Sequence, residues 1–136
     1  MNRCFFELIL AIKQKCQCNE GQIQKALGLS QAEFNGLLVL DGGREISGCE
    51  FAERMGLSPS RGSRVLNTLV LGGYVQTRTR REDRRTVLIS LTPDGREMRE
   101  RIMNCARACE DRIREHLDRL TVGQIRESLE LLEAAI

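Results

Sequence analysis

The sequence predicts a mainly α-helical protein that carries one small β-hairpin. Apolar residues recur every three or four positions over most of the 136 residues, and helix start signals precede these stretches. Aromatic residues make up only 4% of the chain and Trp is absent, so the core is expected to consist of Leu, Ile, Val and Met. Such a core suits helices better than a β-sandwich. A chain of this length is expected to form a single domain.

The first 29 residues predict two short helices. Apolar residues recur at helical spacing from Phe5 to Ile12 and surround the helix almost completely. The pattern breaks around Cys18, where Asn19 is expected to cap a second helix that ends at Gly28. Because the first helix is so apolar, it needs a partner.

The next two predicted helices each begin with a capping box, in which a side chain at each end of a four-residue motif caps a backbone N–H. Ser30 with Glu33 opens one helix, and an Asp-Gly-Gly turn ends it. Ser47 with Glu50 opens the other, which Gly56 closes after about two turns.

A further helix follows after one intervening residue. Ser58 is a favoured cap and Pro59 a favoured first helical residue, so this helix is predicted to run to about Gly72. Two helices joined by so tight a turn indicate a helix-turn-helix. The predicted buried stripe is Val65, Leu66, Leu69 and Val70, and the predicted outward side is Ser60, Arg61, Ser63, Arg64, Asn67 and Thr68.

A β-hairpin is predicted next. Residues 74–79 and 86–92 are β-prone, and in the second run Val87, Ile89 and Leu91 alternate with Thr86, Leu88 and Ser90. The residues between the two runs are Arg80, Arg81, Glu82, Asp83, Arg84 and Arg85. The hairpin therefore has a basic tip.

Two helices complete the chain. Thr92 and Pro93 start a long helix whose apolar residues are Met98, Ile102, Cys105, Cys109, Ile113, Leu117 and Leu120. Thr121 with Gln124 is expected to cap a final helix bearing Ile125, Leu129, Leu132 and Ile136. The terminal helices have apolar faces that the rest of the domain cannot cover, so a second copy of the chain is expected to cover them.

Charge is distributed unevenly along the chain. Its formal net charge is only +2, but residues 54–92 contain eight arginines and two acidic residues. The remainder is therefore net acidic. This asymmetry points to a polyanionic partner for one segment only.

The order of elements and three short motifs resemble the MarR family of winged helix-turn-helix transcription regulators. The motifs are Glu-Phe-Ala-Glu-Arg-Met-Gly-Leu-Ser at residues 50–58, Gly-Tyr-Val at 73–75, and the stretch from Asp83 to Gly95. The resemblance covers residue 30 to the C-terminus. It implies a DNA-binding lobe at residues 30–92 and a helical dimerisation lobe formed by residues 1–29 and 93–136.

The resemblance also implies how the protein would work. Family members form dimers through their terminal helices, read the major groove with the recognition helix and place a wing arginine in the minor groove. The implied partners are a pseudo-palindromic double-stranded operator, a second copy of the chain and, in many members, a small ligand, metal or oxidant that releases DNA. Repression is the commoner behaviour in the family.

The recognition helix and the hairpin supply the predicted DNA contacts. The guanidinium group of arginine can donate two hydrogen bonds to O6 and N7 of guanine, so Arg61 and Arg64 are predicted to read bases. The helix N-terminus at Ser58 can bind a phosphate. The predicted set is Ser58, Ser60, Arg61, Ser63, Arg64, Asn67, Arg78, Arg80, Arg81, Asp83, Arg84 and Arg85. The alternative is that these polar side chains form only a solvated surface.

Within the hairpin, individual arginines have different predicted roles. Asp83 stands two residues before Arg85, so its carboxylate is expected to brace the Arg85 guanidinium, which fits the family's minor-groove arginine. Arg84 is its neighbour. The remaining basic residues are expected to neutralise phosphates, which position a protein without reading sequence; they are Arg78, Arg80 and Arg81.

The sequence leaves open whether its six cysteines bind a metal, react with oxidants or pack in the core. Cys16 and Cys18 are placed at a helix end, Cys105 and Cys109 on one helical face, and Cys49 in the core. Thiolates suit zinc, copper(I) or an iron–sulfur cluster, and exposed thiols react with oxidants. Packing as small hydrophobes is the alternative, since neither spacing matches a strong zinc motif. The candidate metal or redox residues are Cys4, Cys16, Cys18, Cys105 and Cys109.

Other classes of function receive less support. No catalytic constellation is recognisable, so the protein is not expected to be an enzyme. A methyltransferase fragment would need a following nucleotide-binding domain. A protein-interaction module would have to bury the arginine-rich tip against its partner, which is unfavourable unless acidic groups pair with the arginines. Neither a signal peptide nor a membrane span is predicted, so a cytoplasmic location without membrane contact is expected.

Overall fold

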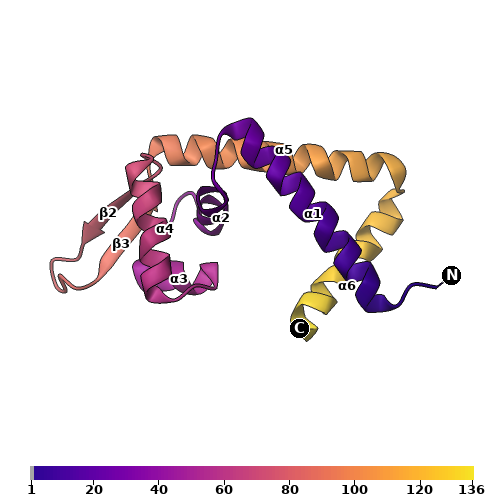
Figure 1. Ribbon diagram of the computed structural model, residues 1–136, viewed down its shortest axis with the longest axis horizontal. Helices are drawn as coiled ribbons and strands as arrows, with labels where there is room; N and C mark the ends of the chain where they lie inside the picture. The colour runs from indigo at the N-terminus through magenta and orange to yellow at the C-terminus, as the bar shows by residue number, and fades with distance from the viewer. Residues whose placement is uncertain (1) are drawn as a thin grey trace. The chain divides into compact units, whose positions relative to one another are not determined.

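The computed structural model describes residues 2–136 and confirms a mostly helical chain with a small antiparallel sheet (Figure 1). By internal contacts the chain divides into two compact units, Met1–Ile102 and Met103–Ile136. The elements are α1 Phe5–Leu27, α2 Gln31–Val39, β1 Ile46–Ser47, α3 Gly48–Met55, α4 Pro59–Leu71, β2 Val75–Thr79, β3 Val87–Leu91, α5 Pro93–His116 and α6 Arg119–Ala135.

The prediction of two short N-terminal helices is wrong, because α1 is one continuous helix. Asn19 lies inside it and caps nothing. The apolar periodicity fades there, but the Lys, Gln and Glu residues that replace it are good helix formers. Gly28 ends α1 as predicted, with a φ of 69° and its N–H directed at the carbonyls of Gln24 and Lys25.

The helix starts of α2 and α3 differ from each other. Ser30 Oγ accepts the Glu33 N–H at 3.2 Å and Glu33 Oε1 accepts the Ser30 N–H at 3.0 Å, which confirms the capping box of α2. Ser47 Oγ caps α3 by accepting the Glu50 N–H at 3.1 Å. The Glu50 carboxylate instead binds Arg54 at 2.9 Å, so the box predicted for α3 is only half formed.

Helices α3 and α4 form the predicted helix-turn-helix and pack closely. Gly56 ends α3 with a φ of 67°, and Ser58 Oγ caps α4 by accepting the Arg61 N–H. At Gly62 the two helices touch, because a Cβ placed there would lie 2.5 Å from Ala52 Cβ. The surrounding core consists of Phe34, Leu37, Leu40, Ile46, Phe51, Leu69, Val75, Ile89, Leu91 and Ile102, with Leu29 at its edge.

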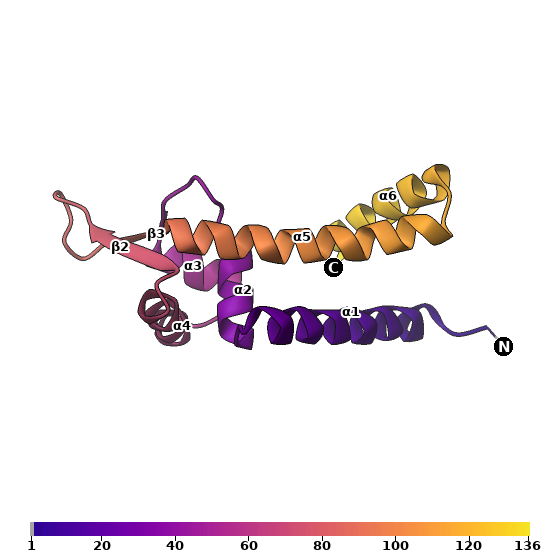
Figure 2. The same cartoon turned by 90° about the horizontal axis from the view of Figure 1, so that it is seen from above.

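The hairpin belongs to a three-stranded sheet. Strands are ordered β1-β3-β2, with Ile46 opposite Ile89 and Val75 opposite Leu91. β1 was not predicted, because two residues carry no alternation. Since Leu88 and Ile89 are both buried, β3 is covered on two faces at that point. Figure 2 shows the β2–β3 hairpin extending away from α2, α3 and α4.

The C-terminal helices start with different caps. Thr92 Oγ1 accepts the Gly95 N–H at 3.1 Å and donates to the Gly73 carbonyl at 2.6 Å, as expected for the start of α5. α6 begins earlier than predicted, because Asp118 Oδ1 accepts the Thr121 N–H at 2.7 Å. None of the described helices is long and apolar enough to cross a membrane.

Each unit exposes large apolar side chains on a terminal helix. On α1, Phe5 is 67% and Phe6 64% exposed, and on α6, Leu120 and Leu131 are each 73% exposed. Both helices lack any fully buried residue. Neither apolar face is covered within its own unit.

Candidate nucleic-acid interface

The outer side of α4 presents the polar residues that the sequence predicts. Gly62 and Leu69 are buried and hold α4 against α3 and the core. Val65 and Leu66 are partly buried as expected, but Val70 is 38% exposed and does not belong to the buried stripe. The exposed residues include Ser60, Arg61, Ser63, Arg64, Asn67 and Thr68. No acidic residue occurs in α4, so nothing on the helix itself neutralises its arginines.

Some polar groups of α4 serve the helix and others are free. Ser58 Oγ accepts the Arg61 N–H and lies 3.3 Å from Ser60 Oγ, so its hydroxyl is used locally. Thr68 Oγ1 donates to the Arg64 carbonyl. Within residues 2–136, no hydrogen bond or ion pair involves the guanidinium group of Arg61, the guanidinium group of Arg64 or the carboxamide of Asn67. These three groups are available to a ligand.

The tip of the hairpin is held by Asp83. Its Oδ1 accepts the backbone N–H of Arg85 at 2.9 Å, and its Oδ2 accepts the Thr86 hydroxyl at 2.7 Å. The prediction that Asp83 braces the Arg85 guanidinium is therefore wrong, since the carboxylate fixes the backbone and leaves the guanidinium free. The exposed arginines of the tip are Arg80, Arg81, Arg84 and Arg85.

The hydrogen bonds to Asp83 also affect its titration. The Thr86 hydroxyl and then the Arg85 N–H lower the pKa of Asp83 below its ordinary value. Because the folded pKa is the lower one, this contribution to the ordered tip is present above the unfolded pKa. It is lost as the pH falls through the folded pKa.

Arg78 differs from the other hairpin arginines because it has a partner. Its Nε and Nη2 donate to the two carboxylate oxygens of Glu45, at 2.5 and 2.6 Å. The hydrogen bonds between the two side chains lower the pKa of Glu45 and raise the pKa of Arg78. The structure thus places Arg78 in an ion pair on β2, opposite Leu88 of β3, where its charge is already balanced.

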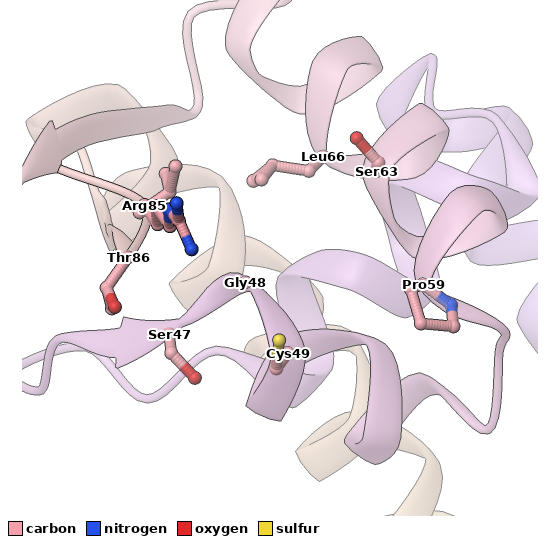
Figure 3. Close-up of a pocket in the computed structure, with 9 residues that line it drawn as sticks. Ser47, Gly48, Cys49, Pro59, Ser63, Leu66, Arg85 and Thr86 are labelled. Carbon is pink, nitrogen blue, oxygen red and sulfur yellow. The ribbon is translucent and has the colours of Figure 1, made fainter. Parts of the chain in front are cut away.

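A hollow of about 400 Å³ lies between α4 and the wing, by which we mean the β2–β3 hairpin (Figure 3). Ser63 and Leu66 of α4 line one side, and Arg85 and Thr86 line the other. Leu66 extends from α4 toward Arg85. Two predicted contacts from different elements, Ser63 and Arg85, are therefore brought to one surface. Cys49 also lines this hollow and is exposed, so its predicted core position is wrong.

The remaining cysteines do not form a ligand set for a metal ion in the described residues. Cys16 and Cys18 lie inside α1 rather than at a helix end, and residues two apart on a helix do not face each other. Cys105 and Cys109 are half-buried on α5, where Cys109 Sγ accepts a hydrogen bond from Arg112. Among residues 2–136, no three His, Cys, Asp or Glu side chains are grouped to hold a metal ion. A redox or metal role stays a prediction, to be checked by metal analysis and thiol counts.

Sequence reasoning missed two residues that shape this surface. Glu45 neutralises Arg78 across a separation of 33 residues, which no local pattern could reveal. Thr86 is predicted only as a strand residue, whereas its hydroxyl donates to Asp83 Oδ2. The available signal was Asp83 itself, because Asp side chains in turns form short-range hydrogen bonds.

Comparisons with known proteins agree with this geometry. Residues 21–86 match the model of the MarR family. Among curated proteins, no relative matches the chain. Wild-type MarR from E. coli, in its apo form, has 20% identity and a TM-score of 0.80, with 97% of this chain and 98% of that chain covered.

Two other solved structures are similar over nearly the whole chain. A MarR-family regulator from Silicibacter pomeroyi has 25% identity and a TM-score of 0.74, with 95% of this chain and 87% of that chain covered. NadR in complex with 4-hydroxyphenylacetate has 19% identity and a TM-score of 0.74, with 97% and 93% covered. The arrangement of elements is therefore that of MarR-family regulators.

Proposed function

We propose that the chain is a MarR-family transcription regulator that binds double-stranded DNA sequence-specifically as a homodimer. Because the family consists of regulators, we propose that the chain is not an enzyme. The observation that carries the proposal is the pairing of two unneutralised basic surfaces in one compact unit. One is the outer side of α4 and the other is the arginine tip of the wing.

The proposed contacts follow from the dimensions of DNA. The major groove admits one α-helix. α4 contains no acidic residue that would repel the phosphates on either side of the groove. The wing would then follow the duplex to the adjacent minor groove, where a narrow A·T-rich segment attracts arginine. Arg85 is the proposed minor-groove residue, because Asp83 fixes its backbone and leaves its guanidinium free.

A salt titration on random-sequence duplex DNA tests the DNA-binding part of the proposal. We expect a dissociation constant of about 1 to 100 µM near physiological salt, with log K falling linearly with log salt. Fluorescence anisotropy with a labelled duplex provides the measurement. If no binding occurs even at low salt, the protein is instead a winged-helix interaction module.

Homodimer formation is the second part of the proposal. It is supported by the uncovered apolar side chains of α1 and α6, which a monomer would leave in water. We expect sedimentation equilibrium to give twice the chain mass of 15.4 kDa. The double variant Phe5→Glu, Phe6→Glu should shift the equilibrium toward monomer. A monomeric wild-type protein at micromolar concentration would contradict the proposal.

The proposed output is repression in the cytoplasm, relieved when a small molecule binds. The structure of NadR contains 4-hydroxyphenylacetate, which supports control by a small organic ligand in this chain as well. Loss of the protein should raise transcription from promoters that it binds, and lowered transcription would instead indicate an activator.

A further inference from the structure

The outer face of α4 is centred on Arg64 and Asn67. Gly62 and Leu69 are buried, and the partly buried residues of the helix lie beside them. With 3.6 residues per turn, the direction opposite to this packed side passes between Arg64 and Asn67. The other residues close to that direction are Ser60 and Leu71.

Only Arg64 and Asn67 combine this position with free polar atoms. Ser60 Oγ lies 3.3 Å from Ser58 Oγ, and Leu71 is apolar although it is 81% exposed. In the described part of the chain, the Arg64 guanidinium and the Asn67 carboxamide have no hydrogen-bond partner. Both side chains line one shallow groove of about 340 Å³ that runs along α4 to Thr77.

The spacing of the two residues matches one step of a DNA duplex. Three helical residues rise about 4.5 Å along the helix axis, and successive base pairs are about 3.4 Å apart. A helix lying in the major groove would therefore bring the two side chains to neighbouring base pairs.

The chemistry of each side chain then selects a base. The arginine fork donates two N–H groups, which matches the two acceptors O6 and N7 of guanine. The carboxamide of asparagine has one acceptor and donors, which match N6 and N7 of adenine. We propose that Arg64 reads a guanine and Asn67 reads an adenine on adjacent base pairs of each half-site. This rests on the proposed function.

Arg61 is predicted from the sequence to read a base as well, but in this arrangement it has a different role. It lies on the same helix and is equally unpartnered, but it points about a quarter turn away from the centre of the outer face. From there it faces the groove wall, where a phosphate is the available partner. Arg61 therefore contributes affinity without base preference.

The test uses the duplex that the wild-type protein selects from a random pool, together with every single-base-pair replacement of it. Wild-type binding should weaken about 5- to 150-fold when either the G·C pair or its A·T neighbour is replaced. Arg64→Ala should lose the preference at the G·C pair only, and Asn67→Ala at the A·T pair only. Arg64→Lys keeps the charge but not the fork, so it should also lose the G·C preference.

Arg61→Ala is the matched control, since it removes the same side chain from the same helix. It should weaken binding to all duplexes by a similar factor and keep the base preferences. If Arg64→Ala and Asn67→Ala also keep every preference, the inference fails while the proposed function stands. If the wild-type protein selects no sequence at all, the proposed function itself fails. Thermal unfolding should be the same for all four variants, because these side chains are exposed.

Discussion

Replacing Gly62 with alanine is expected to lower the free energy of unfolding by about 1 to 3 kcal/mol. The added Cβ would lie 2.5 Å from Ala52 Cβ and 3.0 Å from Ala52 Cα. The second atom belongs to the backbone of α3, so no rotation of a side chain can relieve the contact. Helices α3 and α4 would have to move apart, which also disturbs the buried Phe51 and Leu69. Urea unfolding followed by circular dichroism measures the effect.

Gly21→Ala is the control, because it makes the same substitution in a helix with open space around it. No atom lies within 4 Å of a Cβ at Gly21, so alanine should raise the free energy of unfolding by about 0.5 to 1 kcal/mol. The two substitutions should thus have opposite signs. Stabilisation by both would mean that α3 and α4 do not pack as closely as the structure has them.

Replacing Arg85 with alanine is expected to weaken binding to the selected duplex about 10-fold and to reduce the slope of log K against log salt by about one. The Arg85 guanidinium is exposed and free, whereas its backbone is fixed by Asp83. The variant therefore removes one proposed DNA contact without altering the backbone of the tip. Unfolding should be unchanged.

Arg78→Ala provides a matched control in the same hairpin. Because Glu45 already balances the charge of Arg78, this variant should change DNA affinity and salt slope much less. Equal losses for both variants would show that only total charge matters. Unchanged affinity of Arg85→Ala at several salt concentrations would remove the wing from the interface.

The fold could be predicted well where local signals define it. Ser30, Ser47 and Ser58 start their helices as expected, and Gly28 and Gly56 end theirs, because caps and left-handed glycines act within a few residues. The N-terminal helix was divided wrongly, since a fading apolar pattern reports burial rather than backbone conformation. β1 was missed because only its pairing with β3 makes it a strand.

The candidate site could be predicted as a set of residues but not as a set of contacts. The exposed side of α4 follows from helical periodicity, and the arginine tip follows from the sequence between two strands. The Arg78–Glu45 pair and the presence of Cys49 in the same hollow as Arg85 depend on elements distant in the chain. The bond from Arg85 to Asp83 runs over two residues, yet whether it uses the backbone or the side chain is decided by the turn geometry.

Selection of bound sequences from a random duplex pool tests the central claim most directly. If α4 and the wing of two copies read DNA together, the enriched site will be two-fold symmetric, with half-site centres about 10 base pairs apart or a multiple of that. The same pool should yield no such site with a protein that lacks the proposed base-reading side chains of both surfaces, the triple variant Arg64→Ala, Asn67→Ala, Arg85→Ala. A single asymmetric site would contradict the dimer, and no enrichment by the wild-type protein would contradict sequence-specific binding.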